Sequence, residues 1–230
     1  MRTAVVAIAT AFCLAPVAAN AAKAAPSHDW SRTVVATPEG GFRMGNPAAK
    51  VKLVEYGSLA CPHCRHFEET GYKPLVKDYV GPGRVSYEFR NFLLNAPDLA
   101  VSLLAHCAGP AKFFPMSEVV FATQPRWFQR VGAITDDQKA KMEKLTQQQR
   151  IARLAELAGF AQIAARFGVT PARARQCLAD PKGLARLLNA TKSAEDAGIN
   201  HTPTFLINGK VTDAASWDEL EPQLKKAAGG

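Results

Sequence analysis

The 230-residue sequence predicts an α/β fold in which one sheet domain is interrupted by an all-helical insertion domain. Three observations lead to this prediction. A strand candidate, a helix and a second strand candidate follow one another over residues 51–92, which implies a parallel pair joined by a right-handed crossover. Residues 96–197 carry helix signals and almost no strand signals. Strand character returns at residues 204–211 as a hairpin, and a last helix follows it.

The N-terminus has the form of an export signal. Arg2 supplies a positive charge, residues 4–15 form an apolar run, and Ala19-Asn20-Ala21 offers small residues where a signal peptidase cleaves. We therefore expect residues 1–21 to be a cleaved signal peptide and the mature protein to be soluble and periplasmic. An uncleaved anchor is the alternative, but the stretch contains Pro16 and is shorter than the roughly 20 residues that a membrane span needs.

Export changes the interpretation of the five cysteines, because disulfides persist in oxidising compartments. Cys13 falls within the predicted signal peptide, and the large Phe12 before it argues against a lipoprotein site. The four others are Cys61, Cys64, Cys107 and Cys177. Four cysteines allow three pairings, and only the first two lie close together in the sequence.

The formal net charge is +8, and it falls to +7 when the one Arg of the signal peptide is removed. Basic residues are spread among acidic ones, and no basic patch with interleaved aromatic residues stands out. We therefore expect ordinary solubility and no nucleic-acid partner. Contact with an anionic membrane surface stays open.

The sheet domain begins after a loose tail. Residues 22–44 are expected to form this tail, with a short edge strand at residues 33–36. Residues 51–58 form the next strand candidate, which is apolar apart from Lys52 and Glu55.

A helix is expected from Pro62 to about residue 80, because proline suits the first helical turn, where its missing N–H would be unpaired anyway. A kink is expected at residues 71–74, which hold a glycine and a proline. Another strand candidate covers residues 85–92, so the first part of the sheet domain spans residues 45–95.

Several helices are expected in the insertion, residues 96–197. Residues 99–107 are apolar at helical spacing, and Pro115 is expected to start another turn through Phe121. Further helix starts are marked by N-capping residues or capping boxes, at Thr135, Thr146, Thr170 and Asp180. Gly198 fits the end of the last of these helices.

Residues 198–230 return to the sheet domain. A strand is expected at residues 204–207, and Asn208-Gly209 is a strong hairpin turn that leads to Val211 on the returning strand. Residues 216–219 have the form of a capping box and open a last amphipathic helix.

The pair Cys61 and Cys64 has the form of a redox site. Cys61 lies between a strand and a helix, so unpaired N–H groups and the helix dipole stabilise its thiolate. His63 can add charge or a hydrogen bond to that thiolate. Cys64 lies one turn later, close enough to attack a mixed disulfide formed by Cys61. We therefore predict that Cys61 is the nucleophile and Cys64 the resolving thiol.

The spacing alone leaves two other interpretations open. The pair can be half of a zinc site with His66 as a third ligand, but structural zinc usually needs a second close pair, and Cys107 and Cys177 are 70 residues apart. The pair can also be a plain structural disulfide. The position between a strand and a helix favours a redox function, for which we expect neither a metal nor a bound cofactor.

Two blocks of the sequence resemble the DsbA-like branch of the thioredoxin superfamily. The first runs from Met44-Gly45-Asn46-Pro47 through Val54-Glu55-Tyr56 into Cys61-Pro62-His63-Cys64-Arg65-His66-Phe67. The second is Thr202-Pro203-Thr204-Phe205 followed by Ile207-Asn208-Gly209-Lys210. The resemblance covers residues 45–228 and implies a thioredoxin fold interrupted by a helical insertion.

The resemblance also implies roles for individual residues. Pro62 belongs to the cysteine motif, and Pro203 is expected to be cis and to face the cysteines, so that the backbone of Thr202 can pair with an extended substrate. Glu55 matches a buried acid that moves protons for the second cysteine; a solvent-facing strand residue is the alternative. His201 stands where a glycine is expected, and its role stays open.

Cys107 and Cys177 match cysteines that form a second, structural disulfide in some DsbA-like proteins. Closing so long a loop contributes on the order of 4 kcal/mol in the chain-entropy model. The alternative is two buried free thiols.

Together these features predict an exported thiol–disulfide oxidoreductase that acts as a dithiol oxidase. It passes the Cys61–Cys64 disulfide to reduced exported proteins through a mixed disulfide at Cys61. The resemblance implies a DsbB-like membrane quinone reductase as the reoxidant, and we expect a monomer.

Two alternatives remain. One is a disulfide reductase or isomerase, although residues 22–44 are too short for the dimerisation domain of DsbC-type isomerases. The other is a copper-binding or copper-tolerance thiol protein, which no Met- or His-rich tract supports.

Overall fold

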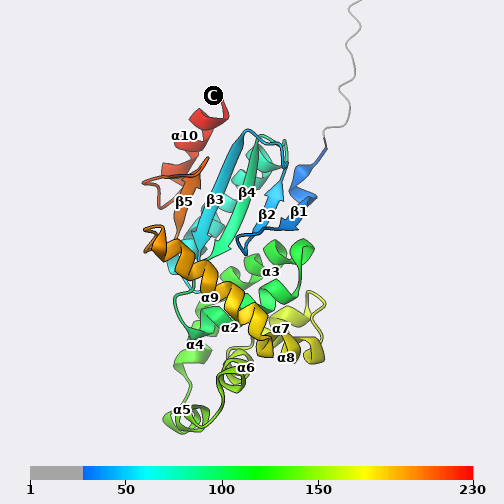
Figure 1. Ribbon diagram of the computed structural model, residues 1–230, viewed down its shortest axis with the longest axis vertical. Helices are drawn as coiled ribbons and strands as arrows, with labels where there is room; N and C mark the ends of the chain where they lie inside the picture. The colour runs from blue at the N-terminus through cyan, green and yellow to red at the C-terminus, as the bar shows by residue number, and fades with distance from the viewer. Residues whose placement is uncertain (1–27, 230) are drawn as a thin grey trace, which may run out of the picture.

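The computed structural model describes residues 28–229, so the predicted signal peptide (residues 1–21) and Cys13 lie outside the described residues. A mixed sheet forms one end of the molecule, and a group of helices lies beyond the end of the sheet to which the arrows of β3 (Val51–Gly57) and β4 (Val85–Asn91) point (Figure 1). This arrangement is the predicted α/β fold with a helical insertion.

The sheet has the strand order β1-β2-β4-β3-β5-β6. Its other strands are β1 (Val34–Ala36), β2 (Phe42–Gly45), β5 (Thr204–Ile207) and β6 (Lys210–Val211). The two central strands, β3 and β4, pair in parallel, and every other neighbouring pair is antiparallel. The strand–helix–strand order over residues 51–92 therefore forms the parallel crossover that the sequence predicts.

The expectation that residues 22–44 are a loose tail with one edge strand is wrong for the part that the structure describes. The edge strand β1 is present, but a short 3-10 helix (Trp30–Arg32) precedes it and β2 follows it. β2 was missed because it is short and its partner β4 lies about 45 residues further along the chain. Phe42 and Met44 of β2 alternate into the core, which gives this short strand its stability.

The helix after Cys61 begins at Pro62, as predicted, and is labelled α1 (Pro62–Phe67). Around the expected kink at residues 71–74, the structure has wider π-helical turns over Glu68–Tyr72 and Leu75–Val80. A proline and π-helical turns are both common causes of helix bending. Gly71 has a packing role instead, because a Cβ there would come within 2.8 Å of the Cβ of Trp217.

Eight helices of the described chain form the insertion. They are α2 (Ala96–Cys107), α3 (Pro110–Ala122), α4 (Gln124–Gly132), α5 (Asp136–Glu143), α6 (Gln147–Ala158), α7 (Phe160–Ala165), α8 (Pro171–Ala179) and α9 (Pro181–Asp196). At four of them the predicted N-cap side chain accepts a hydrogen bond from the first turn; these caps are Thr135, Thr146, Thr170 and Asp180.

Pro115 does not start a helix, which corrects the prediction. α3 begins five residues earlier at Pro110, directly after Gly109, and Pro115 lies inside it. The missing N–H of Pro115 costs one hydrogen bond to the carbonyl of Ala111. The buried side chains of Phe113 and Phe114 on the same helix offset this loss.

The insertion and the sheet share one hydrophobic core. Phe113 of α3 stacks on Phe42 of β2 with ring centroids 4.4 Å apart, and it also contacts Phe89 of β4. The helix α2 is the centre of the insertion, and most of its side chains are buried. The position of the insertion relative to the end of β3 is therefore fixed by packing.

The last helix, α10 (Trp217–Ala228), packs on β3 and β5 through Trp217, Leu220 and Leu224. Ser216 precedes it but makes no side-chain capping bond; instead, the Glu219 carboxylate accepts from the N–H of Ala215. Across residues 28–229, no helix has the length and apolar character that a membrane span requires.

Candidate functional site

The two closely spaced cysteines lie where β3 ends and α1 begins, at the boundary between the sheet and the insertion. Cys61 is the N-cap residue of α1 with extended backbone geometry, and Pro62 occupies the first helical turn. Both Cys61 and Cys64 are free thiols and are almost completely buried, at 4% and 1% exposure. Pro62 and His63 between them are exposed.

The environment of Cys61 favours its thiolate. Its pKa is lowered from 9.0 to about 5, mainly because the Cys64 thiol donates a hydrogen bond to it. The Thr202 side chain and the backbone N–H groups of Cys64 and His63 add to this effect, while burial opposes it. As a thiol, Cys61 donates to the carbonyl oxygen of Thr202 at 3.3 Å. His63 thus contributes through its backbone N–H.

Cys64 has the opposite character. Burial raises the pKa of its thiol well above the usual 9.0, and the pairing with Cys61 and the nearby Glu55 raise it further. The N–H of Ser58 donates to its sulfur at 3.5 Å, which only partly offsets the burial. At neutral pH the site therefore holds one thiolate and one thiol, with fixed identities.

Glu55 lies beneath the two cysteines on β3 and is 1% exposed, so the solvent-facing alternative is wrong. The hydroxyl of Tyr87 on the neighbouring strand β4 donates to its carboxylate. Burial raises the pKa of Glu55 to about 8 despite this hydrogen bond. A carboxyl group with such a pKa can hold a proton near neutral pH and release it to a neighbour.

The loop before β5 faces Cys61 from the other side. The register of β3 with β5, in which Tyr56 opposes Thr204, brings this loop beside the start of α1. The peptide bond between Thr202 and Pro203 is cis, Thr202 is half-buried and Pro203 is buried. His201 is exposed, and its ring lies 3.0 Å from the side-chain oxygen of the adjacent Asn200.

His66 is exposed on α1, whereas Cys61 and Cys64 are buried. Within residues 28–229, no group of three or more His, Cys, Asp or Glu side chains is arranged to hold a metal ion.

Sequence reasoning missed Asp98, a fully buried carboxylate at the start of α2. It accepts hydrogen bonds from the Ser58 hydroxyl at 2.5 Å, the Leu59 N–H at 3.1 Å, the Leu94 N–H at 3.1 Å and the Ser102 hydroxyl at 3.3 Å. Burial outweighs these bonds and raises its pKa to about 6. Asp98 thereby ties the insertion to the loop that carries Cys61.

Gln124, the first residue of α4, was also missed. It is 1% exposed, and its side-chain amide donates to the carbonyl oxygens of Leu59 and Cys61, both at 3.1 Å. A buried donor and a buried acceptor from the insertion therefore hold the same short loop. Neither residue had a local signal, because an acid in a first helical turn and a lone glutamine are common on helix surfaces.

The other two cysteines, Cys107 and Cys177, form a disulfide that joins the end of α2 to α8, with their Cα atoms 6.0 Å apart. Cys107 lies nine residues beyond Asp98 on α2, which is about 14 Å at 1.5 Å per residue. The disulfide is therefore separate from the Cys61–Cys64 site.

Comparisons with known proteins agree with this geometry. A family model described as Thioredoxin matches residues 37–226. A "Putative protein-disulfide oxidoreductase" of Rickettsia bellii is 27% identical over 82% of this chain, which spans 65% of that relative's length.

Among solved structures, the protein-disulfide isomerase from Novosphingobium aromaticivorans is 29% identical with a TM-score of 0.76, covering 83% of this chain and 98% of that one. Wolbachia pipientis alpha-DsbA1, at 22% identity, shares the fold with a TM-score of 0.65 over 81% of this chain and 90% of that one.

Proposed function

The chain belongs to the thioredoxin family, and we propose that it is an exported thiol–disulfide oxidoreductase that acts as a dithiol oxidase. The observation that carries the proposal is the difference between the two thiols, with a pKa of about 5 at Cys61 and a strongly raised pKa at Cys64. A stabilised thiolate favours the reduced dithiol, so the disulfide form is a strong oxidant. The name of the Rickettsia relative supports the same chemistry.

The reaction proceeds in two exchanges. A substrate thiolate attacks the sulfur of Cys61, the Cys61–Cys64 bond breaks, and Cys64 leaves as a thiolate while a mixed disulfide forms at Cys61. A second substrate thiolate then attacks the substrate sulfur of that mixed disulfide, and Cys61 leaves as a stabilised thiolate. The substrate has lost two electrons and gained a disulfide, and the protein holds one dithiol.

Glu55 supplies the proton that Cys64 takes up. The released Cys64 thiolate is buried where its charged form is strongly disfavoured, so it needs a proton at once. Glu55 is buried below it, and its pKa of about 8 lets it hold that proton near neutral pH. In the reverse direction Glu55 accepts the same proton.

Thr202 and Pro203 form the substrate side of the site. The Thr202 carbonyl oxygen lies 3.3 Å from the sulfur of Cys61, so a substrate sulfur bonded to Cys61 comes close to this backbone. An extended substrate segment can pair with the backbone here as an added strand. Pro62 and His63 are exposed beside Cys61, so both can contact the same segment.

The substrates of the protein are reduced, newly exported proteins in the periplasm. The support for this location is the signal-peptide form of residues 1–21. Each turnover leaves a dithiol that must lose two electrons. A membrane quinone reductase of the DsbB type is the reoxidant that the family resemblance implies. The protein acts as a monomer without a bound cofactor.

A second candidate function is disulfide isomerisation, which the name of the Novosphingobium structure favours. An isomerase uses the same Cys61 thiolate, but it attacks wrong disulfides in substrates and must be kept reduced.

The reduction potential of the Cys61–Cys64 pair against glutathione tests the direction of electron flow. A potential near ~−120 mV supports an oxidase, and a potential near ~−270 mV is that of a reductant and contradicts it. Refolding of a scrambled disulfide protein by the reduced form, in the absence of added oxidant, tests isomerisation directly. The Cys64→Ser variant, which traps mixed disulfides, is the control that shows exchange at Cys61.

A further inference from the structure

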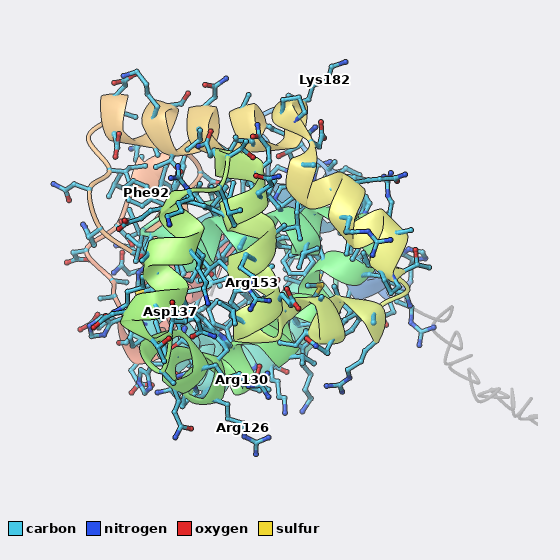
Figure 2. All side chains as sticks on the ribbon, turned by 90° about the horizontal axis from the view of Figure 1, so that it is seen from below. Phe92, Arg126, Arg130, Asp137, Arg153 and Lys182 are labelled. Carbon is cyan, nitrogen blue, oxygen red and sulfur yellow. A yellow bond between two sulfur atoms is a disulfide. The ribbon has the colours of Figure 1, made fainter. Side chains whose placement is uncertain are left out.

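A small hollow between α4 and α7 collects three arginine side chains. Its volume is about 190 Å³, and Arg126 and Arg130 of α4 line it together with Arg166 at the end of α7. No carboxylate lines it. The ion pairs found among residues 28–229 involve none of these three arginines. In Figure 2, Arg126 and Arg130 lie together at the edge of the molecule opposite Lys182.

The packing around Arg130 holds its guanidinium at the hollow. Its Nη1 donates to the carbonyl oxygen of Ala158 at 3.3 Å. The guanidinium also lies directly over Gly159, where any Cβ would overlap it, and Gly159 has a φ of +85° that disfavours other residues. The buried Trp127 borders the same hollow. Three like charges gathered without a counter-charge repel one another, and a bound anion relieves that repulsion.

One helix, α4, carries both a contact with the nucleophile and two arginines of the hollow. Gln124, at the start of α4, donates to the carbonyl oxygen of Cys61, and Arg130 follows six residues later. Six helical residues span about 9 Å at 1.5 Å per residue. An extended polypeptide advances about 3.3 Å per residue, so three to five residues of a substrate segment that runs along α4 from Cys61 cover at least this rise.

We propose that the hollow binds the carboxylate of an acidic residue in the substrate, so that preferred substrates carry Asp or Glu three to five residues from the reactive cysteine. This inference rests on the proposed oxidase function and adds a substrate class to it. Guanidinium groups suit the task because they bind carboxylates through paired hydrogen bonds.

The experiment uses reduced peptides that contain two cysteines and differ only in one residue, Glu, Gln or Lys, placed four positions from the first cysteine. The oxidised protein is mixed with each peptide, and the loss of free thiols gives the rate. We expect the Glu peptide to react about fivefold faster than the Gln peptide at low salt. The preference should vanish near 1 M salt, where the screening length falls to about 3 Å.

Matched variants test whether the arginines of the hollow cause the preference for the Glu peptide. Arg126→Gln with Arg166→Gln leaves the Arg130–Ala158 hydrogen bond in place and should bring the Glu to Gln rate ratio close to one. The control, Lys112→Gln with Lys182→Gln, removes two exposed charges elsewhere on the insertion and should keep both the ratio and the oxidation of dithiothreitol.

Equal rates for the Glu and Gln peptides with the unaltered protein overturn the inference. Binding of phosphatidylglycerol vesicles to the protein through Arg126 and Arg166 also overturns the inference, because the bound anion is then a lipid headgroup. Failure of the unaltered protein to oxidise even dithiothreitol contradicts the proposed oxidase function itself. The two failures are therefore distinguishable.

Discussion

Cys61 and Cys64 stand within one turn of each other at the start of α1, whereas Cys107 and Cys177 join two helices across 70 residues of chain. The first pair is surrounded by groups that shift the pKa values of its thiols: backbone N–H groups, the Thr202 side chain and the buried Glu55. The second pair is a closed bridge between α2 and α8. One cysteine pair is therefore suited to disulfide exchange and the other to bridging two helices, and the surroundings of each pair set this difference.

The comparison predicts that the two pairs fail in different ways. Replacing Cys61 with Ser should lower the rate of dithiol oxidation at least about a thousandfold, because an alcohol cannot take part in disulfide exchange and the remaining thiol, Cys64, is 1% exposed and has a raised pKa. The measurement is the oxidation of dithiothreitol by stoichiometric protein.

The matched control is the double variant Cys107→Ser with Cys177→Ser, which should keep most of the activity at a temperature where it is folded. If Cys61→Ser retained full activity, or if the double variant lost as much, the division of roles between the pairs would be wrong.

Removing the second pair should instead lower the free energy of unfolding. For a closed loop of 70 residues, the chain-entropy model gives a loss of about 4 kcal/mol. Urea denaturation of the oxidised double variant and of the unaltered protein measures this loss, and the Cys61–Cys64 disulfide stays closed in both. A loss below about 1 kcal/mol would show that the bridge adds little to a core that already fixes α2 and α8.

Each cysteine pair has a carboxylate of the insertion near it: the buried Asp98 near Cys61 and the half-buried Asp180 near Cys177. Asp98 holds the loop before Cys61 through four hydrogen bonds, and Asp180 caps α9 through two backbone N–H groups. Asp98→Asn should cost about 2 kcal/mol, because an amide has one acceptor oxygen and cannot serve every donor. Asp180→Asn should cost only a few tenths, since Asn caps helices as well as Asp does.

The readout that separates positioning from stability is the titration of Cys61. If the loop held by Asp98 orients the N–H groups of His63 and Cys64, the pKa of Cys61 should rise from about 5 in Asp98→Asn and stay unchanged in Asp180→Asn. The ultraviolet absorbance of the thiolate follows this titration. An unchanged pKa in both variants would reduce Asp98 to a structural residue.

Local signals in the sequence predicted much of the fold. The capping boxes at Thr135 and Thr146, the proline after Cys61 and the Asn208-Gly209 turn each depend on neighbours within four residues, and the structure confirms these elements. The strand β2 was missed because its stability comes from pairing with a distant strand.

The site was predictable to the same degree. The cysteine motif is local, and the sequence alone places Cys61 directly before a helix. The contacts of Asp98 and Gln124 with Leu59 span 39 and 65 residues, and they exist only because the insertion packs against the end of β3. Such contacts leave no period or spacing in the sequence, so they emerge only from the packed structure.

The smallest effect that we predict is a pH dependence of stability that differs between the redox forms. In the reduced protein the pKa of Cys61 is about 5, against 9.0 for an ordinary thiol, so between these values the unfolded chain binds the extra proton. Stability from Cys61 is therefore present at high pH and is lost as the pH falls through about 5. Glu55 acts in the opposite sense, because its pKa of about 8 exceeds the usual 4.5.

Stability from Glu55 is present below pH 4.5 and is lost as the pH rises towards 8, and burial, the main cause of its raised pKa, acts in both redox forms. In the oxidised protein Cys61 does not titrate, so the free energy of unfolding should fall from pH 5 to pH 8. In the reduced protein the rise from Cys61 opposes this fall, by at most about 1.4 kcal/mol per pH unit. Urea denaturation of both forms across this range tests the difference, and Cys61→Ser should show the fall alone. Parallel pH profiles for the two forms would contradict the low pKa of Cys61, on which the difference between the two cysteine pairs depends.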